Sequence, residues 1–244
     1  MQLATWLKTP SLHALEIARA VGFKVIVLDL EHGFQSVNGS EPVTALGRSM
    51  GLTMYSRIGM ADRLSVQLAL DFGSHGVIIP QIENLDHARE VCGYAKYPPL
   101  GSRGLGSNRT MKYGGVDDAF LATENARTKC FPMIESPGAL RDGRAIAALD
   151  TVDGLFIGPG DLSLSRGRGN FAFQDADRED FATVVAACAN AGKSWAAAVF
   201  ADGVLEWCAK NGAEFGVITS ELAAIHAGLQ AALLRAQTTL SAGP

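Results

Sequence analysis

The chain has 244 residues, of which 48% are hydrophobic and 19% charged, a composition typical of a globular domain and not of a disordered chain. Its formal net charge of −4 argues against a nucleic-acid partner, because phosphate contacts require clustered Lys and Arg. The amino terminus lacks a basic segment followed by a long apolar run, and no apolar stretch approaches the roughly 18 residues of a membrane helix. Four cysteines without a C-x-x-C pair are expected to be buried free thiols. We therefore expect a cytoplasmic protein with no membrane partner.

Short apolar segments alternate with helical patterns along the whole chain. Runs such as Val25–Leu28 and Gly76–Ile79 are apolar at consecutive positions, which is typical of strands buried on both faces of a parallel sheet. In chain order, the predicted strands are Leu3–Trp6, Val25–Asp29, Thr53–Arg57, Gly76–Pro80, Cys130–Glu135, Gly154–Ile157, Trp195–Phe200 and Phe215–Thr219.

The segments between these strands carry helix signals. Ser11, Asp62, Asn84 and Ser136 suit helix N-caps, and Ser136 is followed by a proline that suits the first helical position. No Gly/Ser linker interrupts the pattern. The repeated strand–helix units predict one domain over residues 1–244, an α/β fold of the (β/α)8 TIM-barrel type, for which about 250 residues are typical. Residues 97–115, rich in Gly, Pro, Arg and Ser, are expected to form a long functional loop.

Reactive side chains gather at the carboxyl ends of several predicted strands. In chain order these are Asp29, Glu31, His32, Arg57, Glu135 and Asp161. In a barrel these strand ends converge on one mouth, where active sites lie. The sequence therefore predicts an active site at that mouth.

Glu135 and Asp161 offer hard oxygen ligands without accompanying cysteines. Such a pair suits Mg²⁺ or Mn²⁺, and Co²⁺ could also fit. The alternative is that both are ordinary loop carboxylates or helix caps. The segment Ile157–Ser163 places two glycines around a proline after a strand, so that the backbone could approach a ligand closely. If a helix starts at Asp161, its free N–H groups would face an anionic carboxylate, whereas a structural turn is the other interpretation.

His32 is the candidate base, because histidine titrates near neutral pH and a neighbouring carboxylate, Asp29 or Glu31, can orient it. Arg57 ends an otherwise apolar strand, where a permanent charge is costly unless it is paired. It could pair with a substrate carboxylate or an enolate oxygen. The alternative is an internal ion pair with Glu31 or Glu135.

Five segments together resemble the HpcH/HpaI aldolases, also called class II pyruvate aldolases. The likeness is to the branch of 4-hydroxy-2-oxoheptanedioate and 2-keto-3-deoxy-sugar-acid aldolases, enzymes of aromatic or sugar-acid catabolism. The segments, in family order and with similar spacing, are Leu28–Gly33, Tyr55–Arg57, Tyr97–Gly104, Ile134–Ser136 and Val152–Ser163. They extend over nearly the whole chain.

The resemblance implies a TIM barrel and a homo-oligomer, a trimer or hexamer, with exchange of the last helix between subunits. It assigns metal ligation to Glu135 and Asp161, proton transfer to His32 and transition-state stabilisation to Arg57. It also implies that Asp71 raises the basicity of the histidine from a neighbouring subunit. The residues expected to bind substrate are Trp6, Arg57, Met133, Gly158, Pro159, Gly160, Asp161 and Ser220.

The chain departs from the family pattern at several points. Leu30 occupies a position that is commonly glycine, which would narrow the mouth. Met133 stands where many members carry a glutamine, so that one polar contact with the substrate would be missing. The first strand begins almost at the first residue, so the usual preceding helix is expected to be short or absent. These changes bear on substrate choice more than on fold or metal.

The function expected from these features is metal-dependent (retro-)aldol cleavage of a 4-hydroxy-2-oxo acid to pyruvate and an aldehyde. A Schiff-base aldolase would need a desolvated lysine inside the barrel, and Lys24, Lys129 and Lys193 flank strand starts on the opposite rim. Two other readings remain open: a lyase or decarboxylase acting on a related oxo-diacid or acyl-CoA, and a catalytically silent family member that acts as a binding protein.

Overall fold

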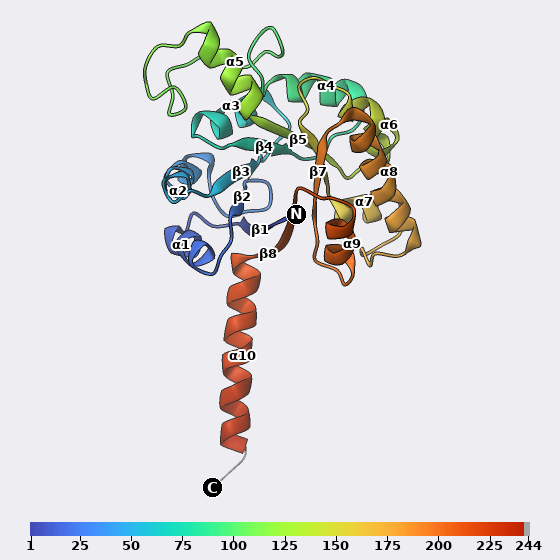
Figure 1. Ribbon diagram of the computed structural model, residues 1–244. Helices are drawn as coiled ribbons and strands as arrows, with labels where there is room; N and C mark the ends of the chain where they lie inside the picture. The colour runs from blue at the N-terminus through green and yellow to red at the C-terminus, as the bar shows by residue number, and fades with distance from the viewer. Residues whose placement is uncertain (242–244) are drawn as a thin grey trace.

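Eight parallel strands pair in chain order and close into a barrel (Figure 1). The structure is a computed structural model and describes residues 1–241. The strands are β1 (Gln2–Leu7), β2 (Val25–Asp29), β3 (Thr53–Arg57), β4 (Gly76–Ile79), β5 (Lys129–Ile134), β6 (Gly154–Ile157), β7 (Ser194–Ala198) and β8 (Phe215–Ser220). The pairing of β1 with β8 closes the barrel. The predicted TIM barrel is confirmed, and predicted strand ends differ from these bounds by at most two residues.

Helices follow the strands on the outside of the barrel (Figure 1). They are α1 (Leu12–Ala20), α2 (Val37–Ser49), α3 (Arg63–Asp71), α4 (Leu85–Gly93), α5 (Asp118–Arg127), α6 (Pro137–Ala147), α7 (Pro159–Ser165), α8 (Asp175–Ala191), α9 (Val204–Lys210) and α10 (Glu221–Ser241). The four predicted N-caps are confirmed. Ser11, Asp62, Asn84 and Ser136 each accept a hydrogen bond from the backbone N–H three residues on. These caps fix where α1, α3, α4 and α6 begin.

Aromatic side chains fill the interior of the barrel below its mouth. Tyr55 stacks on Phe215 with ring centroids 5.2 Å apart, and Phe131 meets both rings edge-on. Phe156 joins Phe215 to Trp6 nearer the carboxyl ends of the strands. A barrel filled in this way is a packed core and not a pore, so it opens to ligands only at its ends.

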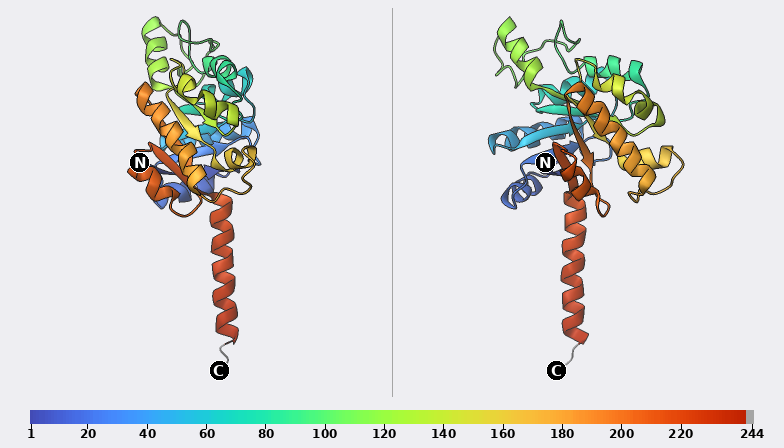
Figure 2. Two further views of the ribbon diagram at one scale, coloured as in Figure 1. Left: turned by 90° about the vertical axis from the view of Figure 1, so that its right-hand side faces the viewer. Right: turned by 45° about the vertical axis from the view of Figure 1, so that its right-hand side comes forward.

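The last helix, α10, extends away from the barrel in every view (Figures 1 and 2). None of its residues is buried, although Ile225, Leu229 and Leu233 are large and apolar. Beside its first turn lies a groove of about 410 Å³ between α1 and the end of β8, lined largely by apolar side chains such as Ile17 and Phe23. Within residues 1–241, no helix combines the length and apolar character needed to cross a membrane. The four cysteines are free and buried, as expected.

Candidate active site

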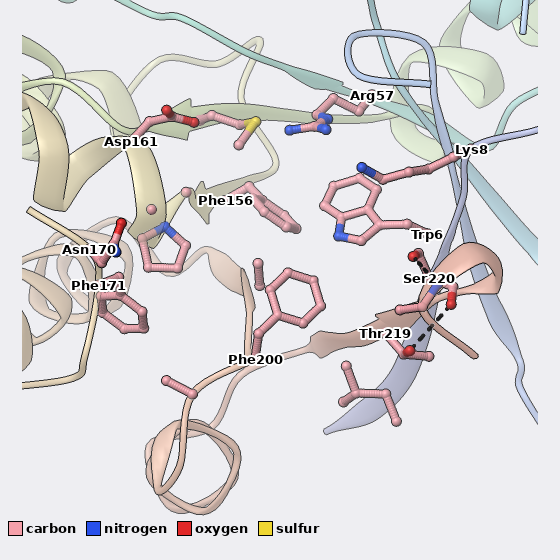
Figure 3. A pocket seen from close by; sticks show the side chains of 18 residues that line it. Trp6, Lys8, Arg57, Phe156, Asp161, Asn170, Phe171, Phe200, Thr219 and Ser220 are labelled. Atoms are coloured by element: carbon pink, nitrogen blue, oxygen red, sulfur yellow. Dashed lines mark hydrogen bonds between the residues drawn. The ribbon is translucent and has the colours of Figure 1, made fainter. Parts of the chain in front are cut away.

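A cavity of about 690 Å³ opens at the carboxyl ends of the strands (Figure 3). All eight residues expected to bind substrate line it: Trp6, Arg57, Met133, Gly158, Pro159, Gly160, Asp161 and Ser220. They come from loops and strand ends that are far apart in sequence. Barrel closure therefore brings the expected substrate-binding residues to one place.

A second cavity, of about 620 Å³, adjoins the first, and Asp161 lines both. Its wall includes Glu31, His32, Glu135 and Gln81. The two expected metal ligands and the expected base thus lie around one space. The mouth is divided by Asp161 into an acidic half and a larger, more apolar half.

Arg57 is clamped by two carboxylates. Its Nε and Nη2 donate to the two carboxylate oxygens of Asp29, at 3.0 and 2.7 Å, and its Nη1 lies 3.1 Å from Glu31 Oε2. The guanidinium also lies over the ring of Trp6, 4.5 Å from its centroid. The internal ion pair with Glu31 considered from the sequence is present, and Asp29 is an additional partner. The guanidinium still lines the cavity, so the clamp orients it without removing it from the site.

The surroundings of Asp29 favour its charged form. Burial acts to raise its pKa, but the hydrogen bond and charge of Arg57 outweigh burial and hold the pKa below its usual value. The backbone N–H groups of Glu31 and His32 also donate to Asp29, at 3.3 and 3.1 Å. One buried carboxylate therefore fixes both Arg57 and the backbone of the segment that carries the candidate base.

Glu135 is almost fully buried, with 6% of its surface exposed. The pKa of this carboxyl is raised to about 7, chiefly by burial and also by the charges of Glu31 and Asp161, which together outweigh a hydrogen bond from the backbone N–H of Gln81 and the charge of Arg57. The glycine at position 158 makes room for it, because a Cβ there would lie 2.6 Å from Glu135 Oε2. Like charges forced together in this way favour a bound cation.

The donor set fits an open cation site and not a closed one. Among residues 1–241, no group of three or more His, Cys, Asp or Glu side chains is placed to hold a metal ion. Glu135 and Asp161 nevertheless line one cavity, and the charge of Asp161 helps to raise the pKa of Glu135. Magnesium is commonly held by one or two carboxylates, with water and substrate completing its shell. The residues present therefore fit a divalent cation that is shared with a substrate.

A helix, α7, does start after β6, and it begins two residues before Asp161, the position considered from the sequence. Gly158 is the N-cap, and Pro159 takes the first helical position, for which its fixed φ is suited. Asp161 therefore lies in the first turn. The N–H groups of Gly160 and Asp161 have no acceptor within the helix, and both residues line the larger cavity.

His32 is well exposed, with 58% of its side chain accessible. Its Nε2 lies 3.9 Å from Glu31 Oε2. Asp71 is not part of the site within one chain. It ends α3, which leads into the amino end of β4, and it accepts hydrogen bonds from Arg103 and Asn108 at 2.9 and 2.8 Å. The long loop after α4 thus contacts Asp71, and none of residues 97–115 lines either cavity.

Sequence comparison agrees with this geometry. Residues 2–223 match the profile of the family described as HpcH/HpaI aldolase/citrate lyase. The chain belongs to the HpcH/HpaI aldolase/citrate lyase family. It is 32% identical over 168 residues to the 4-hydroxy-2-oxovalerate aldolase of Novosphingobium aromaticivorans, a match that covers 68% of this chain and 64% of the relative.

Two further family comparisons extend this result. The chain is 34% identical over 175 residues to the 2-dehydro-3,6-dideoxy-6-sulfogluconate aldolase of Pseudomonas putida, covering 71% of this chain and 68% of that relative. The crystal structure of an HpcH/HpaI aldolase from Desulfitobacterium hafniense DCB-2 superposes with a TM-score of 0.87 at 26% identity, covering 100% of this chain and 93% of that one. Matches to the curated relatives span about two thirds of their length, whereas the structural match is nearly complete.

Sequence reasoning missed Lys8, which lies at the mouth. Its Nζ is 3.6 Å from Asp29 Oδ2, and its side chain lines the larger cavity. The sequence argument against a Schiff-base lysine considered Lys24, Lys129 and Lys193 and did not include Lys8. The signal was available, because Lys8 directly follows β1, which ends at Leu7 and not at Trp6 as predicted. Lys193 does lie at the far rim, where it donates to the carbonyls of Leu149 and Val152.

Sequence reasoning also missed Gln81, which connects two acidic residues of the site. Its backbone N–H donates to Glu135 Oε1, and its Nε2 donates to Glu31 Oε1 at 2.9 Å. Its φ of 56° is unusual for a residue other than glycine. The position after Pro80, at the end of a buried strand, was the available signal. Gln81 therefore connects Glu31, a member of the Arg57 clamp, to Glu135, one of the two expected metal ligands.

Proposed function

We propose that the chain is a divalent-metal-dependent carbon–carbon lyase that cleaves a 4-hydroxy-2-oxo acid to pyruvate and an aldehyde, and catalyses the reverse addition. The observation that carries this proposal is the convergence of Glu135, Asp161, His32 and the clamped Arg57 on adjoining cavities. Family membership and the aldolase relatives support the same reaction class.

Glu135 and Asp161 would hold Mg²⁺, Mn²⁺ or Co²⁺. When bound, such an ion acts as a Lewis acid that polarises the 2-oxo group of the substrate. The first-turn N–H groups of Gly160 and Asp161 would bind the substrate carboxylate, because both are donors without an intrahelical acceptor.

His32 and Arg57 would act on different oxygens of the substrate, His32 on the 4-hydroxyl group and Arg57 on the oxygen of the forming enolate. His32 accepts the proton of the 4-hydroxyl group, and the O–H electron pair becomes the new C=O bond of the aldehyde. The C3–C4 bond breaks, and its electron pair forms the C2–C3 double bond of pyruvate enolate. Arg57, already oriented by Asp29 and Glu31, donates to the oxygen that gains charge. Protonation at C3 then yields pyruvate.

The partner proposed for this chain is a second copy of itself. Helix α10 has 21 residues and no buried side chain, and it begins beside an apolar groove. A helix from another subunit can cover that groove while its own helix covers the groove of the partner. Assembly as a trimer or hexamer would also offer a route by which Asp71 of one subunit approaches His32 of another.

Pyruvate release from a panel of 4-hydroxy-2-oxo acids tests the proposed reaction. Activity is expected with Mg²⁺, Mn²⁺ or Co²⁺, and it should vanish after chelation and return when the metal is restored. Asp161→Asn should abolish it with the fold intact. Asp175→Asn, which removes a fully exposed carboxylate from α8, is the matched control. Full activity in metal-free protein would refute the proposal.

Lys8 makes a Schiff-base mechanism directly testable. Borohydride reduction in the presence of pyruvate is expected to leave the chain unmodified. Lys8 lies beside the buried carboxylate of Asp29 and not in the desolvated apolar setting that a Schiff-base lysine needs. A mass increase at Lys8 after reduction would replace the metal-dependent mechanism with a covalent one.

A further inference from the structure

The larger cavity is far more spacious than a three-carbon acid requires. Its volume of about 690 Å³ falls in the range of about 300–1,000 Å³ that is typical of sites for much larger ligands. The proposed pyruvate-binding groups, Arg57 and Asp161, lie on one side of the open space, and Phe171 and Phe200 lie on the other (Figure 3). The remaining space is continuous with the reacting end.

Carbon forms most of the wall beyond these groups. The side chains that form it are Trp6, Met133, Phe156, Phe171, Phe200 and Ile218. Trp6, Met133 and Phe156 are buried in the barrel, whereas Phe200 is 59% exposed at the rim. An aromatic side chain left this exposed beside a cavity offers apolar surface to an incoming ligand.

Apart from Asp161 and the amide of Asn170, the polar side chains in this wall are engaged with the protein itself. Arg57 and Lys8 face Asp29, and Arg57 also contacts Glu31. The Thr219 hydroxyl donates to the Ser220 carbonyl at 3.3 Å, and the Ser220 hydroxyl accepts from the Ala223 N–H at 3.2 Å.

The hydroxyl groups of a sugar-like chain would therefore meet few complementary partners here, and each hydroxyl buried without one opposes binding. Met133 adds to this effect, because a thioether is at best a weak acceptor and donates nothing.

We propose that this cavity selects an aldehyde with an aliphatic or aromatic side chain over a polyhydroxylated aldehyde. The inference rests on the proposed function and deepens it. Pyruvate occupies the end near Asp161 and Arg57, and the apolar tail of the substrate extends over Phe156 towards Phe171, Phe200 and Ile218. The physiological substrate is accordingly a 4-hydroxy-2-oxo acid with an apolar group beyond C4.

The test measures kcat/KM for aldehydes in the addition direction, with saturating pyruvate and Mn²⁺. Each methylene added from acetaldehyde to pentanal should raise kcat/KM by about fourfold, the factor that corresponds to about 0.8 kcal/mol per buried methylene. Butanal should exceed erythrose, which has the same carbon chain with three hydroxyls, by tenfold or more. A flat series, or a preference for erythrose, would overturn the inference.

A substitution at Phe200 tests whether this part of the cavity wall causes the preference for apolar aldehydes. Phe200→Ser should reduce the preference for pentanal over acetaldehyde by at least threefold, and thermal unfolding checks that the variant is folded. Tyr113→Ser changes another exposed aromatic residue that does not line the cavity and should leave the preference unchanged. An unaltered preference in Phe200→Ser contradicts the proposed position of the tail.

Deuterium exchange at C3 of pyruvate separates the two levels of the proposal, because it requires enolate formation but no aldehyde. Exchange combined with a preference for polyhydroxylated aldehydes overturns this inference alone. No exchange with Mg²⁺, Mn²⁺ or Co²⁺ overturns the proposed function, and the inference fails with it.

Discussion

The carboxylate of Asp29 is the part of the site whose replacement has the most predictable consequence. Asp29→Asn keeps the shape of the side chain but removes its charge. The amide oxygen can still accept from Arg57 Nε and from the backbone N–H groups of Glu31 and His32. The amide nitrogen then faces Arg57 Nη2, which loses its 2.7 Å hydrogen bond to Asp29.

The expected loss of stability in Asp29→Asn follows from this lost hydrogen bond. A hydrogen bond between charged groups contributes about 1.5–3 kcal/mol, and removing one partner of a buried ion pair costs about 3–5 kcal/mol. Because Glu31 remains 3.1 Å from Arg57, the guanidinium keeps one partner and the cost should lie within the lower of these ranges. We expect the free energy of unfolding to fall by about 2 kcal/mol. A guanidinium that is no longer clamped should also lower kcat/KM for pyruvate release by about tenfold to a hundredfold.

Urea unfolding and steady-state kinetics measure the two effects separately. Asp153→Asn is the matched control, because Asp153 pairs with buried Lys96 at 2.8 Å at the opposite end of the barrel. It should lower stability without changing kcat/KM. If Asp29→Asn is destabilised but keeps kcat/KM within twofold of the unaltered chain, the clamp does not orient Arg57 for catalysis. If its stability is unchanged, the ion pair has been assigned too large a role.

Three other predictions concern separate parts of the molecule. In Gln81→Asn, the asparagine tolerates the positive φ but is too short to reach Glu31. The variant should therefore bind Mn²⁺ more weakly in calorimetry at an unchanged unfolding temperature, and unaltered binding would contradict a positioning role for Gln81. Burial and the charges of Arg48 and Arg127 lower the pKa of His75 to about 4, so the unfolded state binds more protons below about pH 6.5. The contribution of His75 to stability should therefore fall by about 1–2 kcal/mol between pH 6.5 and 4, after allowance for partial exposure, and it is measured as the difference between the unaltered chain and His75→Asn in urea unfolding at each pH, because the raised pKa of Glu135 acts in the opposite direction in both proteins. Leu229→Glu combined with Leu233→Glu on α10 should reduce the assembly mass measured by light scattering, and an unchanged mass would exclude α10 from the subunit contact.

The barrel could be predicted because parallel strands buried on both faces leave a local signal. Runs such as Val25–Leu28 are apolar at every position and are followed by polar strand ends. Helix starts were equally local, because a Ser, Asp or Asn cap bonds a backbone group only three residues away. The start of α7 was left open between a turn and a helix because Gly158 caps it without a side-chain hydrogen bond, and the proline at the first helical position marks the start.

The contacts of the site were less predictable because they depend on barrel closure. That Asp29 and Arg57 share a mouth follows from strand order, but their bidentate pairing depends on the register of β2 with β3, which places the two residues side by side. Lys8 was not considered because its strand was predicted to end one residue too early. The connecting role of Gln81 depends on a backbone angle that a glutamine seldom adopts. The outward direction of α10 leaves no distinct pattern in its sequence, since an apolar face suits its own barrel or another subunit equally.

Binding of Mn²⁺ in the presence and absence of pyruvate tests the central claim most directly. Calorimetric titration should give one site per chain, with pyruvate and Mn²⁺ each tightening the binding of the other, because both share the space beside Glu135 and Asp161. Glu135→Gln and Asp161→Asn should each abolish that coupling, whereas Asp175→Asn should retain it. Equal Mn²⁺ affinity in all three variants and the unaltered chain would show that these carboxylates do not form the metal site.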